Sequence, residues 1–126
     1  MLAVTEYAVS SAYKNFTPDR LETKGGWLTN PGDVIGAWVQ ADFHKAVSKI
    51  GIINGFWELD DRADWKWHHR IMNAALNGHN ILLVDSQDEQ VFHLPKPSES
   101  VRIVVLGTYP PEKFPVIGMM GLRALS

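Results

Sequence analysis

A strict alternation of side chains in one short segment restricts the fold of this sequence more than any other feature. In Gly36–Phe43, every second residue, including Val39, Ala41 and Phe43, falls on one face and is apolar. The intervening residues, such as Trp38, fall on the other face and are mostly polar or amphipathic. A period of two is typical of a β-strand with one buried face. The segment therefore predicts a strand at the surface of a packed β-structure.

Seven further segments resemble short strands, and several of them end at turn signals such as Asn54-Gly55 and Asn77-Gly78. They are the segment around Tyr7–Tyr13, then Val47–Ile53, Ile71–Leu76, Ile81–Val84, Gln90–Leu94, Val101–Leu106 and Val116–Leu125. About eight short strands with turns every ten residues or so are typical of an all-β sandwich or barrel. No repeat or linker divides the sequence, so we expect a single domain over residues 1–126.

One segment also fits a helix. Arg62–Leu76 contains no Gly or Pro, and Trp65, Met72 and Leu76 are spaced close to a helical period. A helix here would interrupt the β-pattern on both sides. We therefore favour a long loop that runs into a strand and keep the helix as the alternative.

Composition excludes several classes of protein. Five tryptophans, five phenylalanines and three tyrosines in 126 residues require a packed interior or a binding surface. The net charge of −2 provides no basic surface for nucleic acid, and the longest apolar runs, of about four residues, predict no membrane span, which needs about twenty. Cysteine is absent, which excludes disulfides and cysteine-based zinc sites.

The N-terminal residues lack the pattern of a signal peptide. The localisation is left open by this observation. We expect an extracellular location if the chain is a domain cut from a longer exported protein, and a cytoplasmic one otherwise.

The order of several segments resembles that of the discoidin, or coagulation-factor type C, domain, which belongs to the galactose-binding-like family. Gly36–Phe43 followed by Val47–Phe56 is similar to the centre of that domain. Val101–Tyr109 and Ile117–Leu125 look like its late and closing strands, and Tyr7–Tyr13 looks like its opening strand. The resemblance implies an all-β, jelly-roll-like β-sandwich of about eight antiparallel strands.

The resemblance also implies a binding surface made of loops at one end of the sandwich. By this implication, the surface consists of Leu28–Asp33, Phe56–Arg70 and Tyr109–Phe114. Many members of the family hold calcium in an early loop. Here Asp19 and Glu22 have carboxylate oxygens, but neighbouring basic residues weaken such a cation site. We therefore expect no cofactor, and calcium is not favoured.

The middle segment of this surface is rich in aromatic and charged residues. A sugar places its C–H face on an aromatic ring, while carboxylate, imidazole and guanidinium groups bond to its hydroxyls. We expect Trp57 or Trp67 to be the stacking platform. The candidate ligand-binding residues are Trp57, Asp61, Trp65, Trp67, His68, Arg70 and Tyr109.

Structural roles compete with these functional ones. Trp27 and Trp38 are interpreted as structural, and one of the three tryptophans in the middle segment is expected in the core. Arg70 has the alternative of pairing with Asp60 or Asp64 and bracing the loop.

A metal site is not expected at the adjacent histidines His68 and His69. Neighbouring residues on a strand point to opposite faces, so the two imidazoles cannot chelate one ion together.

The favoured function is a non-catalytic, lectin-like module that binds a glycan or a glycosylated surface. The alternative is a protein–protein adaptor subunit with the same fold. Hydrolysis is disfavoured because no nucleophile motif or metal-ligand spacing accompanies the aspartates of the middle segment. Binding to anionic lipid is disfavoured by the acidic character of that segment.

Overall fold

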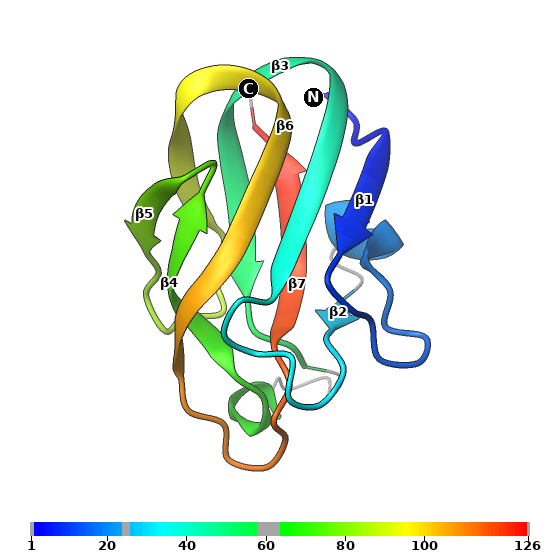
Figure 1. The fold of residues 1–126 in the computed structure, drawn as a ribbon, viewed down its shortest axis with the longest axis vertical. Coiled ribbons are helices and arrows are strands. Elements are labelled where there is room, and N and C mark those ends of the chain that lie inside the picture. The colour runs from blue at the N-terminus through cyan, green and yellow to red at the C-terminus, as the bar shows by residue number, and fades with distance from the viewer. Residues whose placement is uncertain (1, 24–25, 58–63, 126) are drawn as a thin grey trace.

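Two long strands connect the layers of this fold in the computed structural model, which describes residues 2–23, 26–57 and 64–125. β3 covers Trp38–Asn54 and β6 covers Gln90–Tyr109, and both arch over the molecule in Figure 1. The shorter strands are β1 (Glu6–Val9), β2 (Trp27–Leu28), β4 (Arg70–Leu76), β5 (His79–Leu82) and β7 (Gly118–Ala124). Two short 3-10 helices, η1 (Pro18–Thr23) and η2 (Trp65–Trp67), lie between them. No helix of the described residues is long and apolar enough to cross a membrane.

All strand pairs between these elements are antiparallel, in the order β2-β7-β3-β6-β4-β5 with β1 added to β3. The first half of β3 pairs with β1 and with the second half of β6, which also pairs with β4. The second half of β3 pairs with β7 and with the first half of β6. The long strands thus take part in two layers, and the predicted all-β, jelly-roll-like sandwich is confirmed.

The number of strands differs from the prediction, because seven strands replace the expected eight or so. The predicted strands Gly36–Phe43 and Val47–Ile53 are parts of β3, and the predicted strands Gln90–Leu94 and Val101–Leu106 are parts of β6. The register between β3 and β6 shifts between Asp42 and Val47. Such an irregularity bends a strand and breaks its alternation, so in the sequence it resembles a turn.

The buried face predicted for β3 is correct, since Val39, Ala41 and Phe43 are buried in the core. Trp27 is fully buried, and its indole N–H donates to the Ser11 carbonyl at 2.9 Å. Its predicted structural role is confirmed.

The Asn54-Gly55 pair lies at the end of β3. Gly55 has a φ of +86°, which favours glycine, as the turn signal predicts. Asn54 is fully buried, and its carboxamide donates to the Ile71 carbonyl at 2.7 Å and accepts from the Ile71 N–H at 2.8 Å. One side chain therefore satisfies both backbone groups of a buried residue on the neighbouring element.

The substitution Asn54→Ala is expected to lower the free energy of unfolding by about 3 kcal/mol, because it leaves both backbone groups of Ile71 buried without partners. Urea denaturation measures this loss. The matched control Asn80→Ala removes an exposed carboxamide from β5 and is expected to change stability by less than about 0.5 kcal/mol. Equal losses in the two variants would contradict the role given to Asn54.

Candidate ligand-binding site at the loop end

The three segments predicted to form a binding surface meet at one end of the sandwich (Figure 1, bottom). The N–H groups of Lys113 and Phe114 donate to the Trp67 carbonyl at 3.1 and 2.8 Å. The Gly32 N–H donates to the Pro115 carbonyl at 2.9 Å. Backbone hydrogen bonds thus join the second segment to the third and the first segment to the residues that follow the third.

The middle segment enters β4 without an α-helix in its described part. Asp64 precedes the single 3-10 turn η2, and β4 begins at Arg70. The favoured prediction, a loop that runs into a strand, is therefore confirmed for residues 64–76 over the helical alternative.

A pocket of about 280 Å3 opens among these segments. Most of its lining is aromatic or apolar, and His68 is the one residue of the lining with an ionisable side chain near neutral pH. The lining residues are Tyr13, Phe16, Leu28, Pro31, His68, Phe114, Pro115 and Val116. An apolar cavity with one imidazole can contact the C–H face of a ligand and exchange one directed hydrogen bond with it.

A row of ring contacts builds the wall of this pocket. The Phe16 and Phe56 rings meet edge to face at 5.1 Å, and Phe56 meets the imidazole of His68 at 5.2 Å. Phe114 stacks on that imidazole at 5.4 Å with an angle of 28°. Phe114 is 45% exposed, so one ring of the row faces solvent. This ring is free to contact a ligand.

His68 is buried and neutral at neutral pH. Burial lowers its pKa, and this effect outweighs the opposing effects of the Asp64 charge and of a hydrogen bond to the Phe56 backbone. That hydrogen bond favours the charged ring, while the ring nitrogen Nδ1 has no hydrogen-bond partner among the described residues. Within the described part of the chain, Nδ1 is thus a buried polar atom without a partner, in a residue that is only 6% exposed.

Trp67 lies next to the pocket rather than in its lining. Its ring meets Phe114 at 6.4 Å, and the Lys113 ammonium lies 3.7 Å from the centre of the indole. This cation–π contact and the backbone hydrogen bonds of Trp67 hold the third segment against the second.

The guanidinium of Arg70 forms hydrogen bonds within the protein. It is bonded to the Asp85 carboxylate at 3.0 and 2.9 Å, and also to the carbonyls of Lys66, His68 and Pro110. The side chain is 5% exposed. This geometry gives Arg70 its alternative role, bracing the loop. Its ion-pair partner among the described residues is Asp85 rather than Asp64, and Asp60 lies outside those residues.

The other candidate residues lie apart from the pocket or outside the described chain. Trp65 contacts the Arg70 guanidinium at 5.3 Å, and Tyr109 donates its hydroxyl to the Leu83 carbonyl at 2.8 Å. Trp57 is partly exposed, and Asp61 lies outside the described residues. Of the seven candidates, His68 lines the pocket and Trp67 borders it.

Two aromatic residues of the lining were not among the candidates. Tyr13 and Phe16 face each other across a tight turn, in which the Phe16 N–H donates to the Tyr13 carbonyl at 3.0 Å. Lys14, inside the turn, has a φ of +51°. The sequence signal is two aromatics that flank a Lys-Asn pair, which is weak because the opening segment resembles a strand.

The residues considered for calcium do not form a cation site. A Glu22 oxygen accepts the Val4 N–H at 2.7 Å, and an Asp19 oxygen accepts the Thr17 hydroxyl. Among the described residues, no group of three or more His, Asp or Glu side chains is placed to hold a metal ion. The described carboxylates of this loop, Asp19 and Glu22, therefore bond to other groups of the protein.

Several solved carbohydrate-binding modules have this fold. The family 32 carbohydrate-binding module of C. perfringens NanJ, in complex with galactose, has a TM-score of 0.66 at 14% identity over 94% of this chain and 91% of that chain. A pectin-binding carbohydrate-binding module has a TM-score of 0.64 at 13% identity over 100% of this chain and 93% of that chain. A Streptococcus pneumoniae fucose-binding module has a TM-score of 0.59 at 12% identity, covering 95% and 89%.

These similarities establish the galactose-binding-like β-sandwich fold that the resemblance to discoidin domains implies. They rest on structure, since no protein-family model matches the sequence and a search of curated proteins finds no similar sequence.

Replacing Arg70 with lysine is expected to lower the free energy of unfolding by about 2 kcal/mol, because an ammonium cannot serve the Asp85 carboxylate and three carbonyls together. Chemical denaturation gives the value. The control Arg102→Lys changes an exposed arginine of β6 that donates to Gln40 and lies over the Trp38 ring, so its expected loss is below about 1 kcal/mol. A loss for Arg70→Lys no greater than that of the control would show that the guanidinium is not a brace.

The stability of the protein is expected to fall as the pH drops below about 6.5, because the unfolded chain takes up a proton at the ordinary histidine pKa while burial resists protonation of His68. The contribution of His68 to the free energy of unfolding is complete above that pH and is lost as the pH falls toward the lowered pKa. The free energy of unfolding then changes by at most about 1.4 kcal/mol per pH unit for one group. His69, whose pKa is also lowered, first by burial and then by Arg70, adds to the effect.

Denaturation between pH 7.5 and 4.5 measures this slope, and His68→Phe is expected to reduce it. The control His93→Phe replaces an exposed histidine of β6 and leaves the buried imidazole in place. An unchanged slope in His68→Phe would refute the link between pH and this side chain.

Proposed function

We propose that this chain is a non-catalytic carbohydrate-binding module and that its loop-end pocket binds one sugar residue of a glycan. The observation that carries the proposal is the buried Nδ1 of His68, which has no partner among residues 2–23, 26–57 and 64–125 and lies beside an aromatic-lined pocket. A buried acceptor without a donor costs free energy. A sugar hydroxyl supplies that donor while the C–H face of the same ring packs on Phe114.

The size and lining of the pocket support a small ligand. Its volume of about 280 Å3 is at the low end of the range for small-molecule sites, which favours a single ring over a chain of sugars. The Phe114 ring stacks on the imidazole of His68. Its exposure leaves room for a change of rotamer, through which the hydroxyl reaches Nδ1.

The remaining candidate residues have supporting roles in this proposal. Trp67 and Lys113 border the pocket and contact the next sugar of a longer glycan. Arg70 and Tyr109 hold the loops in place through hydrogen bonds to backbone carbonyls. Trp57 and Asp61 remain predicted ligand contacts on the same segment.

The binding partners of the structural neighbours agree with a glycan ligand. The NanJ module is in complex with galactose, and other neighbours are described as pectin-binding and fucose-binding modules. For this chain, the corresponding partner is a glycan or a glycosylated surface.

A protein–protein adaptor is the second candidate. It is favoured by three exposed apolar side chains, Leu82, Val84 and Val91, at 77, 67 and 51% exposure. The Gln90 side chain bonds to the Val84 backbone and so brings the start of β6 to the end of β5. A concave pocket with an unpaired buried acceptor fits a small polar ligand better than a flat apolar patch does.

The test is calorimetric titration with galactose, fucose and N-acetylglucosamine. At least one of them is expected to bind with a Kd on the order of 1 mM, as its few atoms imply. Phe114→Ala is expected to weaken binding about tenfold through the loss of ring stacking. Affinity is also expected to fall at acidic pH, because protonated Nδ1 no longer accepts a hydrogen bond.

The matched control is Leu82→Ala, which truncates an exposed apolar side chain of β5 away from the pocket. It is expected to leave the affinity unchanged. The proposed site would be overturned if the folded protein bound none of these sugars at tens of millimolar. It would also be overturned if Phe114→Ala and Leu82→Ala lost equal affinity.

A further inference from the structure

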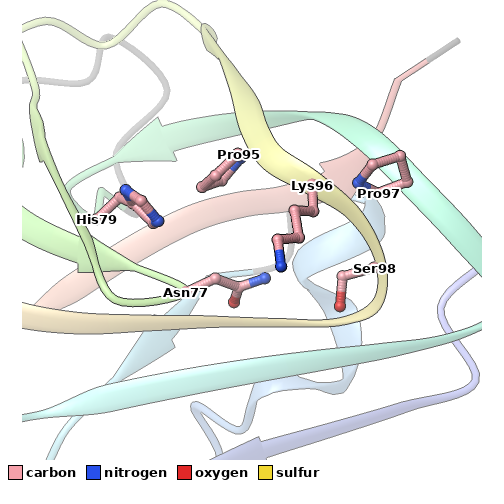
Figure 2. A pocket seen from close by; sticks show the side chains of 6 residues that line it. All are labelled: Asn77, His79, Pro95, Lys96, Pro97 and Ser98. Carbon is pink, nitrogen blue, oxygen red and sulfur yellow. The ribbon is translucent and has the colours of Figure 1, made fainter.

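A second pocket lies at the opposite end of the sandwich, between the β4–β5 hairpin and the bend of β6 (Figures 1 and 2). Its volume is about 360 Å3. The residues that line it are Asn77, His79, Pro95, Lys96, Pro97 and Ser98.

The bend of β6 results from an insertion in its pairing with β3. Lys49 pairs with His93 and Val47 pairs with Ser98, so one residue of β3 is opposed by four residues of β6. Pro95 and Pro97 lie among these four residues of β6, where the lack of a proline N–H costs no hydrogen bond between strands. The chain therefore leaves the sheet here and forms a rim with two proline rings.

The floor of the pocket is fixed by hydrogen bonds within the protein. The Asn77 carboxamide donates to the Ser100 carbonyl at 3.1 Å and accepts from the Arg102 N–H at 2.8 Å. The Ser98 hydroxyl donates to the Ser100 carbonyl at 2.7 Å. The Asn77 carboxamide therefore holds the hairpin against β6, while the Ser98 hydroxyl fixes the chain just after the bend.

Two basic side chains in the lining make no such hydrogen bonds within the described part of the chain. Lys96 and His79 are exposed, and no hydrogen bond or ion pair is assigned to either within the described part of the chain. Figure 2 shows Lys96 extending from the bend toward Asn77, with His79 on the hairpin side. None of the six lining residues is acidic. Glu99, which follows Ser98 in β6, is not part of the lining.

We propose that this pocket is a second binding site, which takes an acidic sugar residue, that is, a hydroxylated ring that carries a carboxylate or a sulfate. The Lys96 ammonium pairs with the anion, and the His79 imidazole bonds to the ring or to the anion. The Pro95 and Pro97 rings pack against the C–H groups of the sugar. The volume exceeds what a bare inorganic anion fills. The choice of a sugar as ligand rests on the proposed carbohydrate-binding function, but the site uses no residue of the loop-end pocket.

The test is an NMR titration of the full chain with galacturonate, galactose 6-sulfate, neutral galactose and inorganic sulfate, each followed at the backbone amides. We expect at least one acidic sugar to shift the amides of Asn77, His79, Lys96 and Ser98. The acidic sugar that binds more tightly identifies the preferred anion, either a carboxylate or a sulfate. Neutral galactose is expected to leave these amides unshifted. Shifts at Phe114 report the loop-end pocket separately in the same spectra, so the two sites are tested independently.

Lys96→Met is expected to weaken the binding of the acidic sugar at this end about fivefold, as the loss of one exposed ion pair predicts. The matched control Lys45→Met removes an exposed lysine of β3 that does not line the pocket, and it is expected to leave the affinity unchanged. Thermal unfolding of both variants checks that the fold is intact.

Three results would overturn the proposal. One is the absence of shifts at these amides with both acidic sugars at tens of millimolar. Another is binding of neutral galactose or of inorganic sulfate as tight as that of the acidic sugars, which would remove the role of the anion or of the ring. The third is an equal loss of affinity in Lys96→Met and Lys45→Met, which would mean a general effect of charge.

Discussion

The loop end of this protein depends on a single buried cation. The Arg70 guanidinium bonds to the Asp85 carboxylate and to three backbone carbonyls, from Lys66, His68 and Pro110. A buried charge is strongly unfavourable unless it is paired, so these segments are stable only together. The Trp67 carbonyl then accepts the N–H groups of the next loop. The positions of His68 and Phe114, and with them the pocket, follow from this arrangement.

The sequence pattern predicts the framework because alternation reports burial directly. The apolar face of β3 and the Asn54-Gly55 turn are both where the pattern places them. The two long strands were predicted as separate pieces, since bulges break the alternation without ending the strand. The burial pattern also explains why this chain shares its fold with carbohydrate-binding modules at 14% identity or less. The apolar pattern specifies the sandwich, whereas the identity of most residues does not.

The candidate site was only partly predictable. The three segments were correctly grouped, because loops at one end of a sandwich lie together. The partner of Arg70 was expected among the nearby aspartates, but Asp85 reaches it from beyond the β4–β5 hairpin. Such pairing depends on tertiary structure and leaves no local signal. Tyr13 and Phe16 were missed for a similar reason, since their position in the pocket comes from a tight turn within a strand-like segment.

The most direct measurement is a crystal structure of the protein with the best-binding neutral monosaccharide. We expect the sugar ring in the loop-end pocket, with its C–H face on Phe114 and one hydroxyl within hydrogen-bond distance of Nδ1 of His68. A sugar bound elsewhere on the molecule, or a ring in this pocket that leaves Nδ1 without a donor, would contradict the account.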